Sequence, residues 1–150
     1  MLKKELFEDI KSNLIKYPLI KPRKHMNQED VIDLLIIYNY NTYNKFLLDC
    51  QLGINNPTEE ISDNLINKFK EYIDDYFLKT TPHDIDLREF TKYISLYITY
   101  ILNKPLHPIA KISTHYEIKK DNNQQYLCKM RVDHIGEDDS LCRFCVCKSL

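Results

Sequence analysis

The sequence predicts a mainly α-helical protein, a bundle of about four helices followed by a small C-terminal β-hairpin with a cysteine knuckle. Three observations support this fold class. Apolar residues recur at three- and four-residue steps over most of residues 1–104, which is typical of amphipathic helices. All six prolines fall at or between the proposed helix boundaries, where they interrupt no helix. After Pro108 the pattern changes to alternating and β-branched residues, which indicates strands.

Length and composition favour one globular domain. A chain of 150 residues has the usual size of a single domain, with the bundle over 1–104 and the hairpin and cysteine cluster over 105–150. Its 43% hydrophobic and 29% charged residues argue against disorder. A net charge of −1 disfavours bulk electrostatic binding to nucleic acid. The two glycines are too few for a phosphate-binding loop or a dinucleotide fingerprint.

The sequence also predicts a cytoplasmic protein that does not enter a membrane. Its longest purely apolar run is Leu34–Tyr38, far shorter than the ~20 residues that span a bilayer. The N-terminal stretch Met1–Glu5 is charged and lacks the apolar core of a signal peptide. In the cytoplasm, five cysteines are more typical of thiols or metal ligands than of a disulfide framework.

The first two helices are expected on either side of a basic connection. Residues 1–17 form the first helix, which Pro18 ends, and its apolar stripe repeats at four-residue steps, Leu2, Leu6, Ile10 and Leu14. The second helix is expected after Asn27, a good N-cap that precedes a polar, acidic first turn. Its middle, Asn39–Asn44, is poor in helix formers, which leaves a break possible there.

The third and fourth helices share one starting pattern, Asn56-Pro57-Thr58-Glu59 and Thr81-Pro82-His83-Asp84. Each supplies a capping side chain, a proline at the first helical position and an acid two residues later. We therefore predict helices that begin at these two patterns, the second ending before Pro105. A β-hairpin is then expected from Ile112–Ile118 and Gln125–Val132, with Lys119–Asn123 as its turn.

Cysteines are concentrated at the end of the chain. Four of the five lie in the last 23 residues, and two of these form the pair Cys142-x2-Cys145, whose sulfurs can face one ion from a tight turn. Cys128 lies earlier, on the second predicted strand. Three such thiolates resemble the layout of a small structural zinc site. The spacing leaves the fourth ligand open among three residues, Cys147, His134 and His107.

Other functions compete with a zinc site. Four thiolates also hold iron–sulfur clusters, and the same cysteines could carry reversible thiol–disulfide chemistry. They could also be small core residues without any chemistry. Cys50 is a more distant ligand candidate, because it fits the apolar stripe of a predicted helix. No catalytic motif is present, and the chain therefore leans away from being an enzyme.

The predicted hairpin is basic and offers a third function, contact with RNA or DNA. Tyr116 and Tyr126 accompany a group of cations, Lys104, Lys111, Lys119, Lys120, Lys129 and Arg131. Basic patches with interleaved aromatic residues are typical of nucleic-acid-binding surfaces. The patch is small, however, and an ordinary solvated hairpin is the favoured interpretation.

The C-terminal motifs resemble a known family. The matching elements are His107-Pro108, Tyr126-Leu-Cys128 and Leu141-Cys142-x-Phe144-Cys145. Together they are similar to the C-terminus of an uncharacterised protein family of methanogenic archaea, a domain of unknown function. In that family the segment after His-Pro is rich in glycine and proline, whereas here it reads Ile109–Ser113.

The resemblance bears on the ligand set but gives no reaction. Cys128, Cys142 and Cys145 match the family pattern, whereas Cys147 does not, and this moves His107 up as the fourth ligand. The resemblance implies a site and an anaerobic archaeal setting. We therefore expect a small zinc-stabilised binding or adaptor module, with a redox or iron–sulfur protein and a nucleic-acid adaptor as alternatives. A protein partner is compatible with this expectation.

Overall fold

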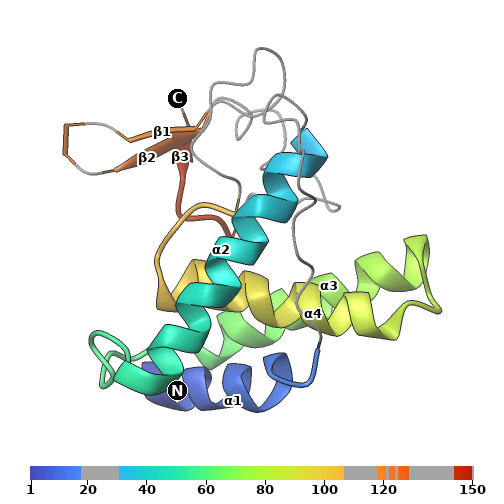
Figure 1. Cartoon of the computed structure of the whole chain (residues 1–150), viewed down its shortest axis with the longest axis horizontal. Helices are drawn as coiled ribbons and strands as arrows, with labels where there is room; N and C mark the ends of the chain where they lie inside the picture. Colours follow the sequence, from blue (N-terminus) through green and yellow to red (C-terminus); the bar gives the residue numbers. More distant parts are fainter. Residues whose placement is uncertain (18–30, 107–117, 121, 124, 129–143, 150) are drawn as a thin grey trace.

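The computed structural model describes residues 1–17, 31–106, 118–120, 122–123, 125–128 and 144–149 (Figure 1). This part of the chain is mainly helical, as predicted. Its helices are α1 (Lys3–Leu14), α2 (Val31–Leu52), α3 (Asp63–Thr80) and α4 (Ile85–Leu96), and α4 continues as the π-helical segment η1 (Tyr97–Ile101). None of the helices in these ranges is both long and apolar enough to cross a membrane.

The helices share one apolar core. α1 and α3 both pack against α4, and α2 crosses α4 (Figure 1). On α1 the predicted stripe is confirmed, because Leu6, Ile10 and Leu14 are fully buried. Burial of such a side chain stabilises a fold by about 1.5–3 kcal/mol. Phe46 of α2 and Tyr97 of η1 complete the centre of the core, with ring centroids 5.6 Å apart and an edge-to-face orientation.

α2 has no break at Asn39–Asn44, where the weak helix propensity left one possible. The helix runs without interruption because tertiary packing outweighs propensity. Tyr43 is buried against the core, and its neighbour Thr42 is buried with its hydroxyl donating to the Tyr38 carbonyl at 2.7 Å. The hydroxyl is thereby satisfied inside the helix. The expected N-cap, Asn27, lies outside the described residues.

The predicted start of the third helix at Asn56 is wrong. α3 begins at Asp63, and the Ser62 hydroxyl caps it by accepting from the Leu65 amide at 3.3 Å. The preceding segment, residues 57–61, runs beside the start of α1 instead. The Lys3 amide donates to the Glu59 carbonyl at 2.8 Å, and the Lys4 amide donates to the Pro57 carbonyl at 2.9 Å. These carbonyls satisfy amides that have no partner within α1 itself.

The fourth helix also begins later than its sequence pattern predicts. Asp84 is the N-cap of α4, and its side chain accepts from the Leu87 amide at 3.1 Å. Thr81, the predicted cap, ends α3 instead, because its amide donates to the Phe77 carbonyl at 2.9 Å. The predicted end before Pro105 is confirmed, with the last turn in π form. There the Leu102 amide donates to the Tyr97 carbonyl at 3.0 Å.

A small three-stranded sheet follows the helices in the order β1 (Ile118–Lys120), β2 (Tyr126–Cys128) and β3 (Lys148–Ser149). β1 and β2 are antiparallel, which confirms a hairpin. Its turn begins later than predicted, because Lys119 and Lys120 pair with Leu127 and Tyr126. The outer parts of the predicted strands lie outside the described residues. β3 was not predicted, and it pairs with β2 in parallel.

Candidate functional site

Three cysteines meet beside the small sheet, and we call them the cysteine cluster: Cys128, Cys145 and Cys147. Cys128 ends β2 and Cys147 immediately precedes β3. Both are buried and pack together, and Cys145 and Tyr126 pack against them. The parallel register between β2 and β3 places Cys128 opposite Ser149. Pairing of the two strands therefore brings sulfurs from distant parts of the sequence into one apolar environment.

The cluster contains three of the five predicted metal ligands. The other two, Cys142 and His107, lie outside the described residues, as does the further candidate His134. Within the ranges that the structure describes, no three His, Cys, Asp or Glu side chains are arranged to hold a metal ion. The cluster is thus one part of the predicted ligand set. The complete metal site stays a prediction.

Cys50 does not join the cluster. It lies near the end of α2 and packs, half-buried, against the main helical core. Burial raises the pKa of its thiol, while the nearby Lys11 of α1 opposes that shift and Asp49 adds to it. A thiol with a raised pKa is less often ionised, and the thiolate is the form that binds metals. Cys50 is therefore a poor ligand and a suitable control residue.

Aromatic contacts fix the cysteine cluster to the bundle. Phe144, which immediately precedes Cys145, packs edge-on against Phe69 of α3 with ring centroids 5.0 Å apart. Its ring centroid lies 6.0 Å from that of Tyr72 on the same helix. On α2, the Tyr38 hydroxyl donates to the Pro105 carbonyl. Burial raises the pKa of this tyrosine, and the nearby Cys145 contributes in the same direction.

The structure describes only part of the basic patch that was predicted on the hairpin. Lys120 is exposed, and its ammonium lies 5.3 Å from the ring centroid of Tyr126. Lys104 is exposed at the other end of the predicted patch. Several further members, including Lys111 and Arg131, lie outside the described residues. A nucleic-acid surface here stays a prediction.

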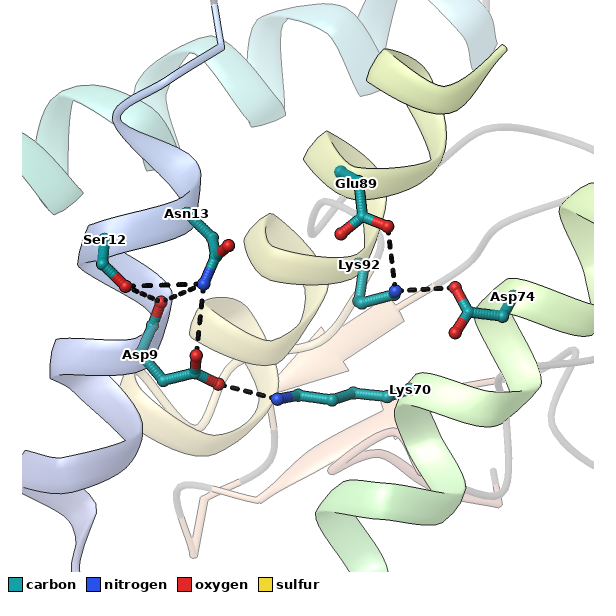
Figure 2. Close-up of polar contacts among 7 residues, drawn as sticks. All are labelled: Asp9, Ser12, Asn13, Lys70, Asp74, Glu89 and Lys92. Atoms are coloured by element: carbon teal, nitrogen blue, oxygen red, sulfur yellow. Dashed lines mark hydrogen bonds and ion pairs between the residues drawn. The ribbon is translucent and has the colours of Figure 1, made fainter. Parts of the chain in front are cut away.

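A network of charges joins three helices, a feature that the sequence did not reveal (Figure 2). On α4 the Lys92 ammonium lies 2.6 Å from Asp74 of α3 and 3.1 Å from Glu89. A separate pair, Lys70 of α3 with Asp9 of α1, is 2.7 Å apart. Every carboxylate shown has a cationic partner. The arrangement therefore suits helix packing rather than acid–base chemistry.

A second polar contact missed by sequence reasoning lies inside the core. Asp49 of α2 is buried, and its carboxylate accepts from the fully buried Tyr97 hydroxyl of η1. The Lys45 ammonium also binds this carboxylate, at 2.8 Å. Burial, followed by the hydrogen bond to Asp49, raises the pKa of Tyr97. The sequence did offer one signal for this contact. Asp49 lies three residues after the core residue Phe46, so an acid falls on the apolar face of the helix.

Comparisons with known proteins identify the family. A family model described as "Uncharacterized protein conserved in archaea (DUF2115)" matches residues 3–150. The chain belongs to this family. A UPF0305 protein of Methanocaldococcus jannaschii is 27% identical over 165 residues, a match that covers 100% of this chain and 98% of the relative. No solved structure gives a significant match.

Membership of the DUF2115 family confirms the resemblance inferred from the C-terminal motifs. The match covers the helices as well as the sheet and the cysteine cluster. It does not test the C-terminal pattern of His107 and the cysteines as a ligand set. The family description names no reaction, ligand or partner. Any function must therefore be argued from the site itself.

Proposed function

We propose that this DUF2115 member is a small cytoplasmic binding or adaptor module whose C-terminal cysteines hold a structural zinc ion. The observation that carries the proposal is the packing of Cys145 against the buried pair Cys128 and Cys147. Zinc in structural sites takes four ligands, and cysteine thiolates are its commonest sulfur donors. Such thiolates persist in a reducing compartment, which supports a cytoplasmic location.

The donor set fits zinc in number and type. In this proposal Cys128 and Cys145 are two of the sulfur ligands, and Cys142, which the sequence spacing pairs with Cys145, is the third. Either Cys147 or His107 completes a tetrahedral set, since Cys₄ and Cys₃His are both ordinary structural zinc sites. Burial of Cys147 beside Cys128 favours the all-cysteine set. The ion would neutralise thiolates that are costly to bury alone.

The size of the sheet gives an energetic reason for a metal. Within the residues that the structure describes, its strands have three, three and two residues. An isolated hairpin is marginally stable at best. Structural zinc contributes ~10–16 kcal/mol of apparent binding free energy at neutral pH. A metal that links β2 to the chain before β3 would therefore stabilise a sheet that its own hydrogen bonds support weakly.

Metal analysis of protein purified without oxygen tests the proposal. We expect one zinc ion per chain in the wild type and its loss in Cys128→Ser and Cys145→Ser. Cys50→Ser is the matched control and should keep the metal, because Cys50 packs in the helical core instead. A folded, monodisperse wild type without metal would refute the proposal. If the analysis finds iron, together with visible sulfur-to-iron charge-transfer absorption, the cysteines hold an iron–sulfur cluster instead of zinc.

Two further variants identify the fourth ligand. If Cys147 is the ligand, Cys147→Ser should lose zinc while His107→Ala retains it. The reverse result would assign the ligand to His107 and would leave Cys147 as a buried core residue. Both variants should be measured by competition with a chelator, because a three-ligand site can retain zinc at reduced affinity.

A further inference from the structure

The outward surface of α2 carries almost no charge. The helix crosses α4 (Figure 1), and it turns Thr42, Tyr43, Phe46 and Asp49 toward the buried interior. From residue 41 to the end of the helix, the exposed residues are Asn41, Asn44, Lys45, Leu47, Leu48, Gln51 and Leu52. Lys45 is the one charged member of this set, and Asp49 binds it at 2.8 Å. The rest of the surface consists of leucines and amides.

The exposed surface of α3 is different, because it carries charges of both signs. They include Lys68, Glu71, Asp75 and Lys79. Surfaces that face water are usually charged in this way, whereas the centre of a protein–protein interface is depleted of charge. On α2 three leucines within two turns are 38%, 45% and 76% exposed, namely Leu47, Leu48 and Leu52. A group of exposed apolar residues without charges marks an interaction surface.

This surface of α2 matches itself when the helix is read in the opposite direction. Its central row advances in steps of four residues: Ile36, Tyr40, Asn44, Leu48 and Leu52. Asn44 is the middle member. In an antiparallel pair of α2 helices with a two-fold axis at Asn44, residues equally far before and after it lie opposite each other. Leu48 then meets Tyr40 of the second copy, and Leu52 meets Ile36.

The exposure of the row and the chemistry of Asn44 both suit this pairing. A row of four-residue steps is inclined to the helix axis, and such rows pack into each other in the commonest class of helix contact. Ile36 and Tyr40 are accordingly half-buried, whereas Leu52 is 76% exposed, so the protruding end of one row meets the recessed end of the other. At the axis Asn44 meets its own copy. An amide both donates and accepts, and two copies can therefore bond to each other.

We propose that α2 is the interface of a homodimer, in which two copies of this surface pack antiparallel across Asn44. A nucleic acid or a charged peptide would find little to bind here, because Lys45 is already neutralised by Asp49. A second copy offers the matching neutral surface. Residues 36–52 span about 25 Å. Two helices of this length bury less than the ~1,600 Å² of a standard interface, and we therefore expect a micromolar dissociation constant. The interface is independent of the proposed zinc site, since it contains none of the proposed ligands.

Sedimentation velocity of the full chain between about 1 and 500 μM measures this association. We expect a monomer–dimer equilibrium that Leu48→Glu weakens at least about tenfold, because the variant buries a carboxylate in an apolar contact. Leu78→Glu is the matched control, since Leu78 is 69% exposed on α3, and it should associate like the wild type. Circular dichroism confirms that each variant is folded. A wild type that stays monomeric at every concentration would overturn the homodimer, and a dimer unaffected by Leu48→Glu would overturn its location.

Charge substitutions at Asn44 test the two-fold axis. Asn44→Asp and Asn44→Lys should each weaken the homodimer at least about tenfold, because like charges then meet at the axis. An equimolar mixture of the two should associate more tightly than either variant alone, because Asp then faces Lys. Asn67→Asp with Asn67→Lys is the control mixture, since Asn67 is an exposed residue of α3, and it should show no such preference. A mixture of the Asn44 variants that associates no better than the separate proteins would refute the antiparallel pairing, including when Leu48→Glu does not fold.

Discussion

Replacement of Lys92 by methionine should destabilise the protein, because this lysine is the most buried cation of the helix network. Its side chain is 8% exposed, and its ammonium contacts both Asp74 and Glu89 (Figure 2). Methionine keeps most of the length and apolar character of the side chain. The substitution therefore removes the charge with little loss of packing and leaves Arg88 as the cation beside both Asp74 and Glu89.

The magnitude follows from how far each carboxylate is buried. Removal of one partner from a fully buried ion pair costs about 3–5 kcal/mol. Here Asp74 is 45% exposed, so water compensates part of its charge. Glu89 is 18% exposed but retains Arg88 at 2.9 Å. We therefore expect a loss of about 2 kcal/mol, which lowers the Tm of a chain this long by about 4–8 °C.

Urea unfolding followed by circular dichroism measures this loss. Lys68→Met is the matched control, because Lys68 is an exposed lysine of α3, and such changes stay within about 0.5 kcal/mol. Asp74→Asn in the Lys92→Met background should recover part of the loss, since it removes a carboxylate that has lost Lys92 and keeps only Arg88, at 3.6 Å. A Lys92→Met protein as stable as the control would show that the network adds nothing to the fold.

Two predictions concern the buried tyrosines. Tyr97→Phe should cost about 1.5–3 kcal/mol in the same urea assay, because it removes a hydrogen bond to the Asp49 carboxylate; an unchanged midpoint would contradict it. Burial raises the pKa of Tyr93 and of Tyr100 to about 12. The unfolded chain releases these protons near pH 10, so stability should be full below pH ~10 and fall by up to ~1.4 kcal/mol per unit and tyrosine up to pH ~12. Tyr100→Phe should flatten that fall, and an equal slope would show that Tyr100 does not contribute.

Local patterns predicted the helices well and their starts less well. The predicted stripe on α1 depends only on helical periodicity; Leu6, Ile10 and Leu14 are buried as expected, whereas Leu2, the N-cap, is only partly buried. The pattern at Asn56-Pro57 is also a local helix-start signal, yet α3 begins at Asp63. Its carbonyls are used by the amides of Lys3 and Lys4, more than fifty residues earlier in the chain. A local pattern cannot report a competing partner that only the fold brings near.

The grouping of the C-terminal cysteines was predictable from their spacing, whereas contacts that depend on strand pairing or helix packing were not. Spacing singled out the C-terminal cysteines, and three of them do pack together. It left the choice between Cys147 and His107 open, because the parallel pairing of β3 with β2 has no signal in a two-residue strand. The pair of Lys70 and Asp9 was equally hidden, since it depends on how α1 lies against α3.

The helical core and the C-terminal tail are stabilised by different contacts, and this decides which part should change when the metal is removed. Among the residues whose burial the structure describes, those of the main core all belong to the four α-helices or to η1, and none of them is a cysteine. The bundle therefore has its own source of stability, while the tail has a short sheet, the cysteine cluster and the ring contact of Phe144. Loss of a metal from the tail should leave the helical signal in place.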